Sequence, residues 1–116
     1  KEIVISNLLL YHTLHADPDI HIDEIALPEK SSGVLNISIR LSNRGVSQPD
    51  KLIISIMDRV ELTRIIQVEP LKPGEEKTIN LKLNLQPGEH NLVFRVIWRK
   101  LSRTMFREER RRVIVS

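Results

Sequence analysis

The chain has no cysteine and few aromatic residues, and these absences exclude several kinds of site. Without a thiolate there is no disulfide framework, no cysteine nucleophile and no cysteine-ligated zinc site. Aromatic residues make up only 3% of the chain, too few for the stacking platforms that bind single-stranded nucleic acid. No apolar run approaches the roughly 20 residues that span a bilayer, and the first residues lack the pattern of a signal peptide. We therefore expect a soluble domain. A chain without cysteine is compatible with both an oxidising and a reducing compartment.

One compact domain is expected from the length and charge of the chain. Its 116 residues can bury roughly 65% of the surface that the unfolded chain exposes. The 18 Lys and Arg residues are nearly balanced by 15 Asp and Glu, which leaves a net charge of +3. This balance is more typical of a surface covered by ion pairs than of one that binds phosphates. Because the chain begins with Lys1 rather than Met, we expect a longer protein whose upstream part could hold an anchor.

Apolar and polar residues alternate along most of the chain, which predicts β-strands. The alternation is clearest over 34–42, where every second residue is apolar. Asn43-Arg44-Gly45 then forms a turn in which glycine tolerates a positive φ and asparagine can bond its own backbone. The closing strand should pair with the strand that ends near Trp98. The other predicted strands are 19–28, 51–57, 62–68, 78–85, 90–98 and the closing strand 104–115.

Strands that alternate with proline and glycine turns, with no helical pattern between them, indicate an all-β sandwich of two sheets. We expect one domain over 19–116, preceded by an N-terminal strand or linker remnant over 1–18. The core should consist of the apolar residues on the inward faces of the strands. These are Leu35, Ile37, Ile39, Leu41, Ile54, Ile56, Ile79, Leu81, Leu83, Leu92, Phe94, Val96 and Trp98.

From Leu35 to Trp98 the order of strands and turns resembles the CARDB family, cell-adhesion-related immunoglobulin-like domains of bacterial and archaeal surface proteins. The matching motifs are Asn43-x-Gly45, Leu71-x-Pro73-Gly74-Glu75 before Thr78-Ile79-x-Leu81, and Pro87-Gly88-Glu89-His90 before Phe94-x-Val96. The resemblance implies an immunoglobulin-like β-sandwich of about seven strands, used for adhesion or assembly and without catalytic residues. One departure is that 99–103 is basic, where the family carries an acidic, Asn-rich segment. A binding role of that segment is therefore not transferred.

Imidazoles and carboxylates are concentrated between residues 12 and 23, and these are ligand types that zinc and calcium use. His21 and Asp23 share a face if this segment is a strand. No metal motif of known spacing is present, so we expect a polar entry loop with an exposed strand face and no cofactor. The weak metal candidates are His12, His15, Asp17, Asp19, His21 and Asp23.

A basic cluster precedes the C-terminus and is the candidate interaction site. Neighbours on a strand alternate faces, so Arg110 and Arg112 share a side with Glu108, while Arg111 lies opposite. Unless a bulge intervenes, the three arginines form no single patch. We interpret the segment as a closing strand with a charged exterior, which discourages edge-to-edge association. The cluster comprises Arg99, Lys100, Arg103, Arg107, Arg110, Arg111 and Arg112.

Two further patterns concern modification and catalysis. Asn36-Ile37-Ser38 fits the N-glycosylation pattern, and Asn36 should point outward because its neighbours point inward. No G-x-S-x-G elbow is present, so a hydrolase triad is not expected. Trp98, at the end of an alternating strand, should serve packing rather than ligand stacking.

We therefore expect a non-enzymatic protein-interaction or adhesion module of a prokaryotic, in particular archaeal, assembly that is extracellular, on the cell surface or membrane-anchored, such as a surface-filament or surface-layer accessory protein. Its partners should be proteins, including copies of itself that pair through an edge strand. One alternative is an intracellular, cytoplasmic accessory domain that docks an acidic protein or nucleic acid through the Arg-rich last strand. A third class is a metal-dependent binding module that uses the segment from His12 to Asp23. An anionic membrane surface is a further candidate partner of the basic cluster.

Overall fold

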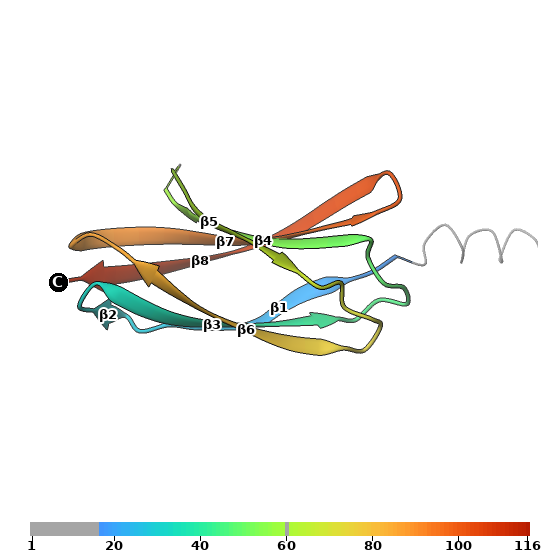
Figure 1. Cartoon of the computed structure of the whole chain (residues 1–116), viewed down its shortest axis with the longest axis horizontal. Coiled ribbons are helices and arrows are strands. Elements are labelled where there is room, and N and C mark those ends of the chain that lie inside the picture. Colours follow the sequence, from blue (N-terminus) through green and yellow to red (C-terminus); the bar gives the residue numbers. More distant parts are fainter. Residues whose placement is uncertain (1–16, 60) are drawn as a thin grey trace, which may run out of the picture.

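A computed structural model describes residues 17–59 and 61–116 (Figure 1), and these residues form strands and no helix. The all-β prediction is confirmed. The strands are β1 (Ile20–Ala26), β2 (Lys30–Ser31), β3 (Val34–Asn43), β4 (Lys51–Asp58), β5 (Glu61–Val68), β6 (Glu76–Asn84), β7 (Gly88–Lys100) and β8 (Arg103–Val115). The strand not foreseen is the two-residue β2. Of the predicted N-terminal segment, residues 1–16 lie outside the described part. Nothing in the described part is a helix long and apolar enough to cross a membrane.

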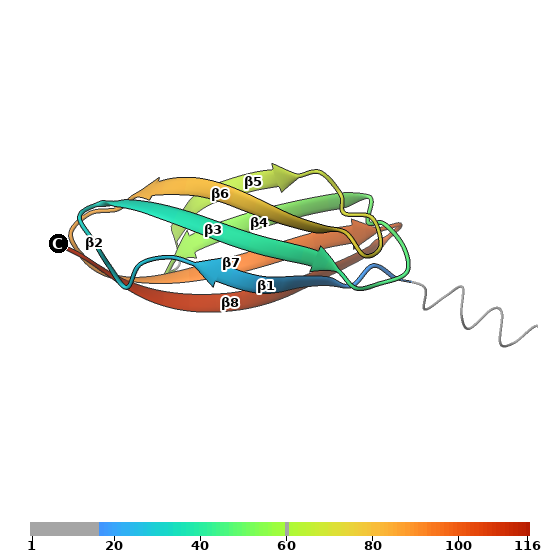
Figure 2. The ribbon, with the colours of Figure 1, turned by 90° about the horizontal axis from the view of Figure 1, so that it is seen from below.

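The strands form two sheets that pack face to face. The smaller sheet has the order β1-β3-β6 and the larger sheet the order β2-β8-β7-β4-β5. Strands β4, β5, β7 and β8 of the larger sheet form the upper layer in Figure 1, and the view from below in Figure 2 has the smaller sheet in front. β7 and β8 pair antiparallel from Gly88↔Val115 to Lys100↔Arg103 without a register shift. The predicted pairing of the closing strand is therefore confirmed, and its side chains alternate faces along the whole strand.

The inward faces of both sheets supply the core, as the alternation predicts. β3 shows the rule, since its even-numbered residues from Val34 to Arg40 are exposed or half-buried and the odd-numbered residues between them are buried. All predicted core residues are buried except Ile79, which is partly buried against the cluster. Trp98 is 4% exposed, which confirms its packing role. The core also includes residues that were not predicted, namely Ile20, Ile25, Leu52, Val68, Leu71, Val113 and Val115.

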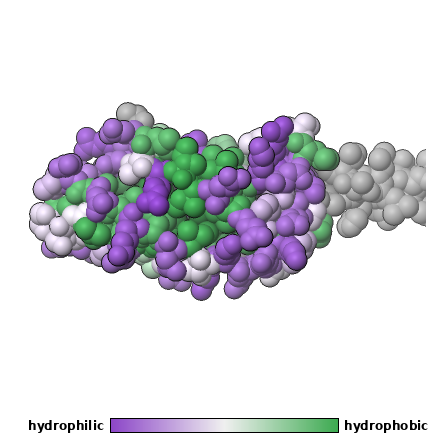
Figure 3. Space-filling model, in the orientation of Figure 1, coloured by the Kyte–Doolittle hydropathy of each residue, from purple (hydrophilic) through white to green (hydrophobic). Residues whose placement is uncertain are grey.

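One long side of the sandwich is open, because β5 and β6 are edge strands of different sheets. Figure 3 shows hydrophobic surface in the middle of this side, between more polar ends. Ile66 of β5 and Ile79 of β6 are the partly buried residues that border the core here. Arg64 crosses the gap, and its Nη1 donates to the carbonyl oxygen of Lys82 over 3.2 Å. This side chain occupies a backbone acceptor that an added strand would need.

Candidate functional site

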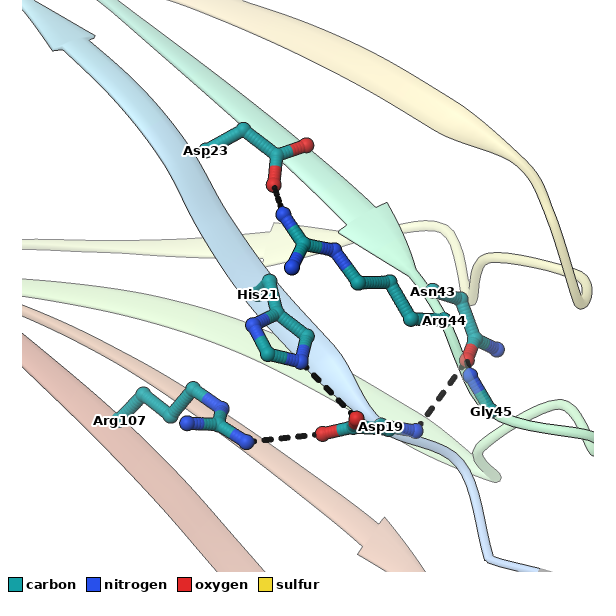
Figure 4. A network of polar contacts seen from close by, with 7 residues as sticks. All are labelled: Asp19, His21, Asp23, Asn43, Arg44, Gly45 and Arg107. Carbon is teal, nitrogen blue, oxygen red and sulfur yellow. Dashed lines mark hydrogen bonds and ion pairs between the residues drawn. The ribbon is translucent and has the colours of Figure 1, made fainter.

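The end of β3 is fixed by Asn43, whose side chain holds three segments together (Figure 4). Its Oδ1 accepts from the backbone N–H groups of Asp19 (3.2 Å) and Gly45 (2.9 Å). Its Nδ2 donates to the carbonyl oxygens of Ser47 and Leu71, both at 2.9 Å. The amide is only 1% exposed, and these bonds use both of its donors and its acceptor oxygen. The predicted asparagine turn is therefore confirmed, and it also anchors the entry to β1.

Gly45 serves this turn for a reason other than the predicted one. The described glycines with positive φ are Gly33, Gly74 and Gly88, so the expectation of a positive φ at Gly45 is wrong. A Cβ at Gly45 would instead lie 2.4 Å from the carbonyl oxygen of Asp17 and 2.5 Å from the backbone nitrogen of Asp19. Glycine is required here because two backbone segments approach closely.

The acidic residues before and within β1 are paired with arginines. Asp17 accepts from Arg103 at 2.6 Å and Asp23 from Arg44 at 2.7 Å. Asp19 accepts from His21 and Arg107, both at 2.9 Å (Figure 4). The hydrogen bond from His21 is the main cause that lowers the pKa of Asp19; partial burial opposes this effect and Arg107 supports it. The carboxylate therefore stays ionised at neutral pH.

Of the described metal candidates, the structure brings only Asp19 and His21 into contact. A β-bulge at Asp23 interrupts the pairing of β1 with β3. Asp23 pairs with Arg44, whereas His21 pairs with Asp19. Within residues 17–59 and 61–116, no group of three His, Asp or Glu side chains could hold a metal ion. His12 and His15 lie outside the described residues.

The basic cluster divides into two sets by strand alternation. Arg103, Arg107 and Arg111 share the face of β8 that turns toward β1, and the first two form the ion pairs with Asp17 and Asp19. Arg111 binds Glu109 at 3.1 Å. Arg110 and Arg112 point to the opposite side. The remaining members support the β7–β8 hairpin and its neighbour, since Arg99 donates to the carbonyl of Leu101 and Lys100 to that of Gln48.

The outward surface of the larger sheet, called the outer face below, carries rows of side chains set by the strand register. One row joins Ile53, Ile97 and Phe106, and the next joins Ser55, Arg95 and Glu108. A third row joins Met57, Val93 and Arg110. Arg95 forms an ion pair with Glu108, and its guanidinium carbon lies 4.9 Å from the centre of the Phe106 ring. Apolar and basic side chains therefore share one continuous surface.

A depression of about 580 Å³ lies at the end of this face, beside the β4–β5 turn. Arg59, Asn91, Val93, Arg110 and Arg112 contribute to its lining. Arg112 pairs with Glu89 at 2.9 Å, whereas Arg59 and Arg110 have no carboxylate partner in the described part of the chain. Two cations that have no carboxylate partner among the described residues make this depression a suitable place for an anionic group.

Sequence reasoning missed most of the outer face and identified only Arg99 of β7 and the arginines of β8. Phe106, Arg59 and the other outward residues of β4 and β7 were not candidates. A signal was present, because β4 and β7 are apolar at outward positions such as Ile53, Val93 and Ile97 as well as at inward ones. Strands that are apolar on both faces are typically covered on both.

Asn36 lies on the exposed face of the smaller sheet, as expected from the alternation of β3. It pairs in register with Lys82 of β6. The two residues help to line a depression of about 530 Å³ beside the end of β1. The Asn36 side chain is therefore sterically accessible to a modifying enzyme, and glycosylation itself stays a prediction.

Comparisons with known proteins identify the fold class of this domain. The chain matches no family model and no curated protein sequence. Among solved structures its sandwich is shared by a domain of the β-glucosidase from Listeria innocua (complex with glucose), with 19% identity and a TM-score of 0.56. A β-glucosidase from Thermotoga neapolitana matches with 16% identity and a TM-score of 0.51. This chain spans only 16% and 17% of those two enzymes. The class is an immunoglobulin-like β-sandwich.

The particular fold is that of a CARDB domain. The CARDB domain of a Pyrococcus furiosus protein, described as a complex with di-metal ions, superposes with a TM-score of 0.66 at 17% identity. The match covers 85% of this chain and 89% of that domain. The predicted resemblance is therefore confirmed at the level of the fold.

Proposed function

We propose that this domain is a non-enzymatic protein-interaction or adhesion module of an archaeal cell-surface or membrane-anchored assembly, such as a surface-filament or surface-layer accessory protein. The observation that carries the proposal is the CARDB architecture. The structural match covers 85% of this chain and 89% of the Pyrococcus furiosus domain. A rigid sandwich of this kind presents loops, strand edges and sheet faces to partners. The membrane anchor would lie upstream of Lys1.

The histidine–aspartate pairs support a structural role over a catalytic one. His90 Nδ1 lies 2.5 Å from Asp58 Oδ2, and its Nε2 lies 2.6 Å from the carbonyl oxygen of Gln86. Both ring nitrogens are thus engaged within the fold, and neither is free to exchange a proton with a substrate. The pair clamps the end of β4 to the start of β7. Asp19, the partner of His21, also accepts from Arg107.

The location is tested with the full-length protein in its native cells. We expect a signal sequence or membrane anchor upstream of this domain, and we expect protease added to intact cells to cleave an epitope tag placed in the β7–β8 turn. A cytoplasmic protein produced in the same cells should stay intact and is the control for lysis. A full-length product without either segment, together with a protected tag, would overturn the proposed location.

Nucleic-acid docking through the last strand is not proposed, because the basic cluster divides between the two sides of β8 and its outward members, Arg99, Arg110 and Arg112, are separated by apolar side chains. Arg103 and Arg107 face β1 and are ion-paired, whereas Arg110 and Arg112 point outward. A gel-shift series with duplex and single-stranded DNA should show no complex even at low salt. Binding that weakens steeply as salt rises would restore this alternative.

A further inference from the structure

Apolar side chains gather on the outer face although they do not belong to the core. Phe106 and Ile65 are each 58% exposed, and Leu62 is 52% exposed. Half-buried residues of the neighbouring strands connect them, and these are Ile53, Met57, Val93 and Ile97. All of them lie outside the core cluster. A contiguous exposed apolar area of this kind marks a surface that another molecule covers.

The same face carries an excess of positive charge. Seven cations stand against three carboxylates, so this face is more positive than the net charge of +3 for the whole chain. The cations are Lys30, Lys51, Arg95, Arg99, Arg110 and Arg112, with Arg59 on the adjoining turn, and the carboxylates are Glu89 and Glu108, with Glu29 beside β2. Arg59 and Arg110, for which residues 17–59 and 61–116 supply no carboxylate partner, lie together at one end of the face.

We infer that the outer face docks a protein partner that presents apolar side chains flanked by carboxylates. The inference rests on the proposed interaction function and identifies its surface and the chemistry of its partner. Phe106, Ile97 and Ile53 form the apolar contact row. Arg110 lies four residues beyond Phe106 on the same strand, which places the two side chains about 13 Å apart along β8. The carboxylates of the partner should therefore lie about 13 Å from its apolar anchor.

Two other occupants fit this face less well. A second copy placed face to face would oppose two surfaces with the same excess of positive charge, and such like-charge contacts are unfavourable. An anionic membrane would bring the Arg95–Glu108 ion pair, in the middle of the face, next to hydrocarbon that offers no compensating polar groups. A protein surface can supply both carboxylates and hydrogen-bonding groups.

The experiment selects a displayed library of random 12-residue peptides against the purified domain. We expect the enriched peptides to combine Asp or Glu with large apolar residues. Phe106→Ala should weaken a selected peptide about 30-fold, because truncating a central aromatic anchor costs the most. Arg110→Glu should weaken it about tenfold. Arg40→Glu reverses a charge on the exposed surface of the smaller sheet, so it should have no effect and serves as the matched control.

A second arm mixes the domain with vesicles of phosphatidylcholine containing phosphatidylserine. Sedimentation with these vesicles that Arg110→Glu abolishes would assign the face to membranes and overturn the inference. Peptides without acidic residues, or peptides that both outer-face variants still bind, would overturn it as well. Peptides that bind elsewhere on the domain would leave the interaction function standing while refuting this surface. No enrichment at all would count against both proposals.

Discussion

Replacing Asn43 by alanine should cause the largest loss of stability among the polar substitutions in this domain. The change removes four side-chain hydrogen bonds, which join the end of β3 to Asp19, Gly45, Ser47 and Leu71. A net contribution of about 1 kcal/mol for each bond gives an upper value near 4 kcal/mol. Water can reach part of this corner after the change, so we expect a loss of about 3 kcal/mol.

The matched control is Asn36→Ala, which removes the same side chain from the same strand. Asn36 is exposed and has no side-chain partner within the described residues, so this variant should change stability by less than about 0.5 kcal/mol. Urea unfolding can be followed by the fluorescence of Trp98, the single tryptophan, which is 4% exposed in the folded domain. For a domain of this size, a loss of about 3 kcal/mol corresponds to a Tm lower by roughly 15 °C.

The two variants should therefore separate clearly in the midpoint of urea unfolding while keeping the same dependence on urea concentration. A loss for Asn43→Ala that stays within 0.5 kcal/mol or so of Asn36→Ala would refute the reasoning. Such a result would mean that residues 17–19 and the turn after β3 are held by other contacts.

Three further outcomes are expected. Gly45→Ala should cost more than about 2 kcal/mol, because its Cβ would lie 2.4 Å from a backbone oxygen. At Gly74 an added Cβ would meet open space, and only the φ of 80° opposes it, so Gly74→Ala should cost only about 1 kcal/mol of stability. Equal losses of stability for the two glycine variants in urea unfolding would contradict this explanation. The hydrogen bond to the backbone carbonyl of Gln86 is the main cause that raises the pKa of His90 above its ordinary 6.5, and the hydrogen bond to Asp58 raises it further. His90→Gln should therefore cost about 2 kcal/mol at pH 5.5, where the histidine is protonated in both the folded and unfolded states. The cost should fall as pH rises through the raised pKa of the folded state, and a loss that is equal at pH 5.5 and pH 9 would contradict this. Calcium or zinc should leave the Tm unchanged, since Asp17, Asp19 and Asp23 already pair with arginines; a shift that EDTA reverses would restore a metal-dependent role.

The strands and most of the core can be predicted from the sequence because alternation is a local property. Each of Leu35, Ile37 and Ile39 is identified as inward by its immediate neighbours, without knowledge of the partner strand. Ile79 follows the same local rule but is only partly buried, because its strand borders the open side of the sandwich. Where an edge lies depends on the order of strands in the sheets, which a local pattern does not contain.

The candidate sites likewise divide into features that local alternation predicts and features that depend on how distant strands pack. Alternation alone predicts that Arg110 and Arg111 point to opposite sides of β8, and the unbroken register confirms it. That Arg103 and Arg107 would meet Asp17 and Asp19 is a long-range consequence of how β1 lies beside β8. The row of Ile53, Ile97 and Phe106 likewise requires the register of β4, β7 and β8. The sequence offered only the hint that β4 and β7 are apolar on both faces.

The most direct test of the interaction function and its surface is site-specific photo-cross-linking of the full-length protein in its native cells. A benzophenone amino acid would replace Phe106 on the outer face in one variant, and Asn80 on the exposed face of the smaller sheet in the other. We predict a discrete adduct only from position 106, with a cross-linked partner peptide that combines acidic and apolar residues. Adducts from neither position, or from both alike, would contradict the account.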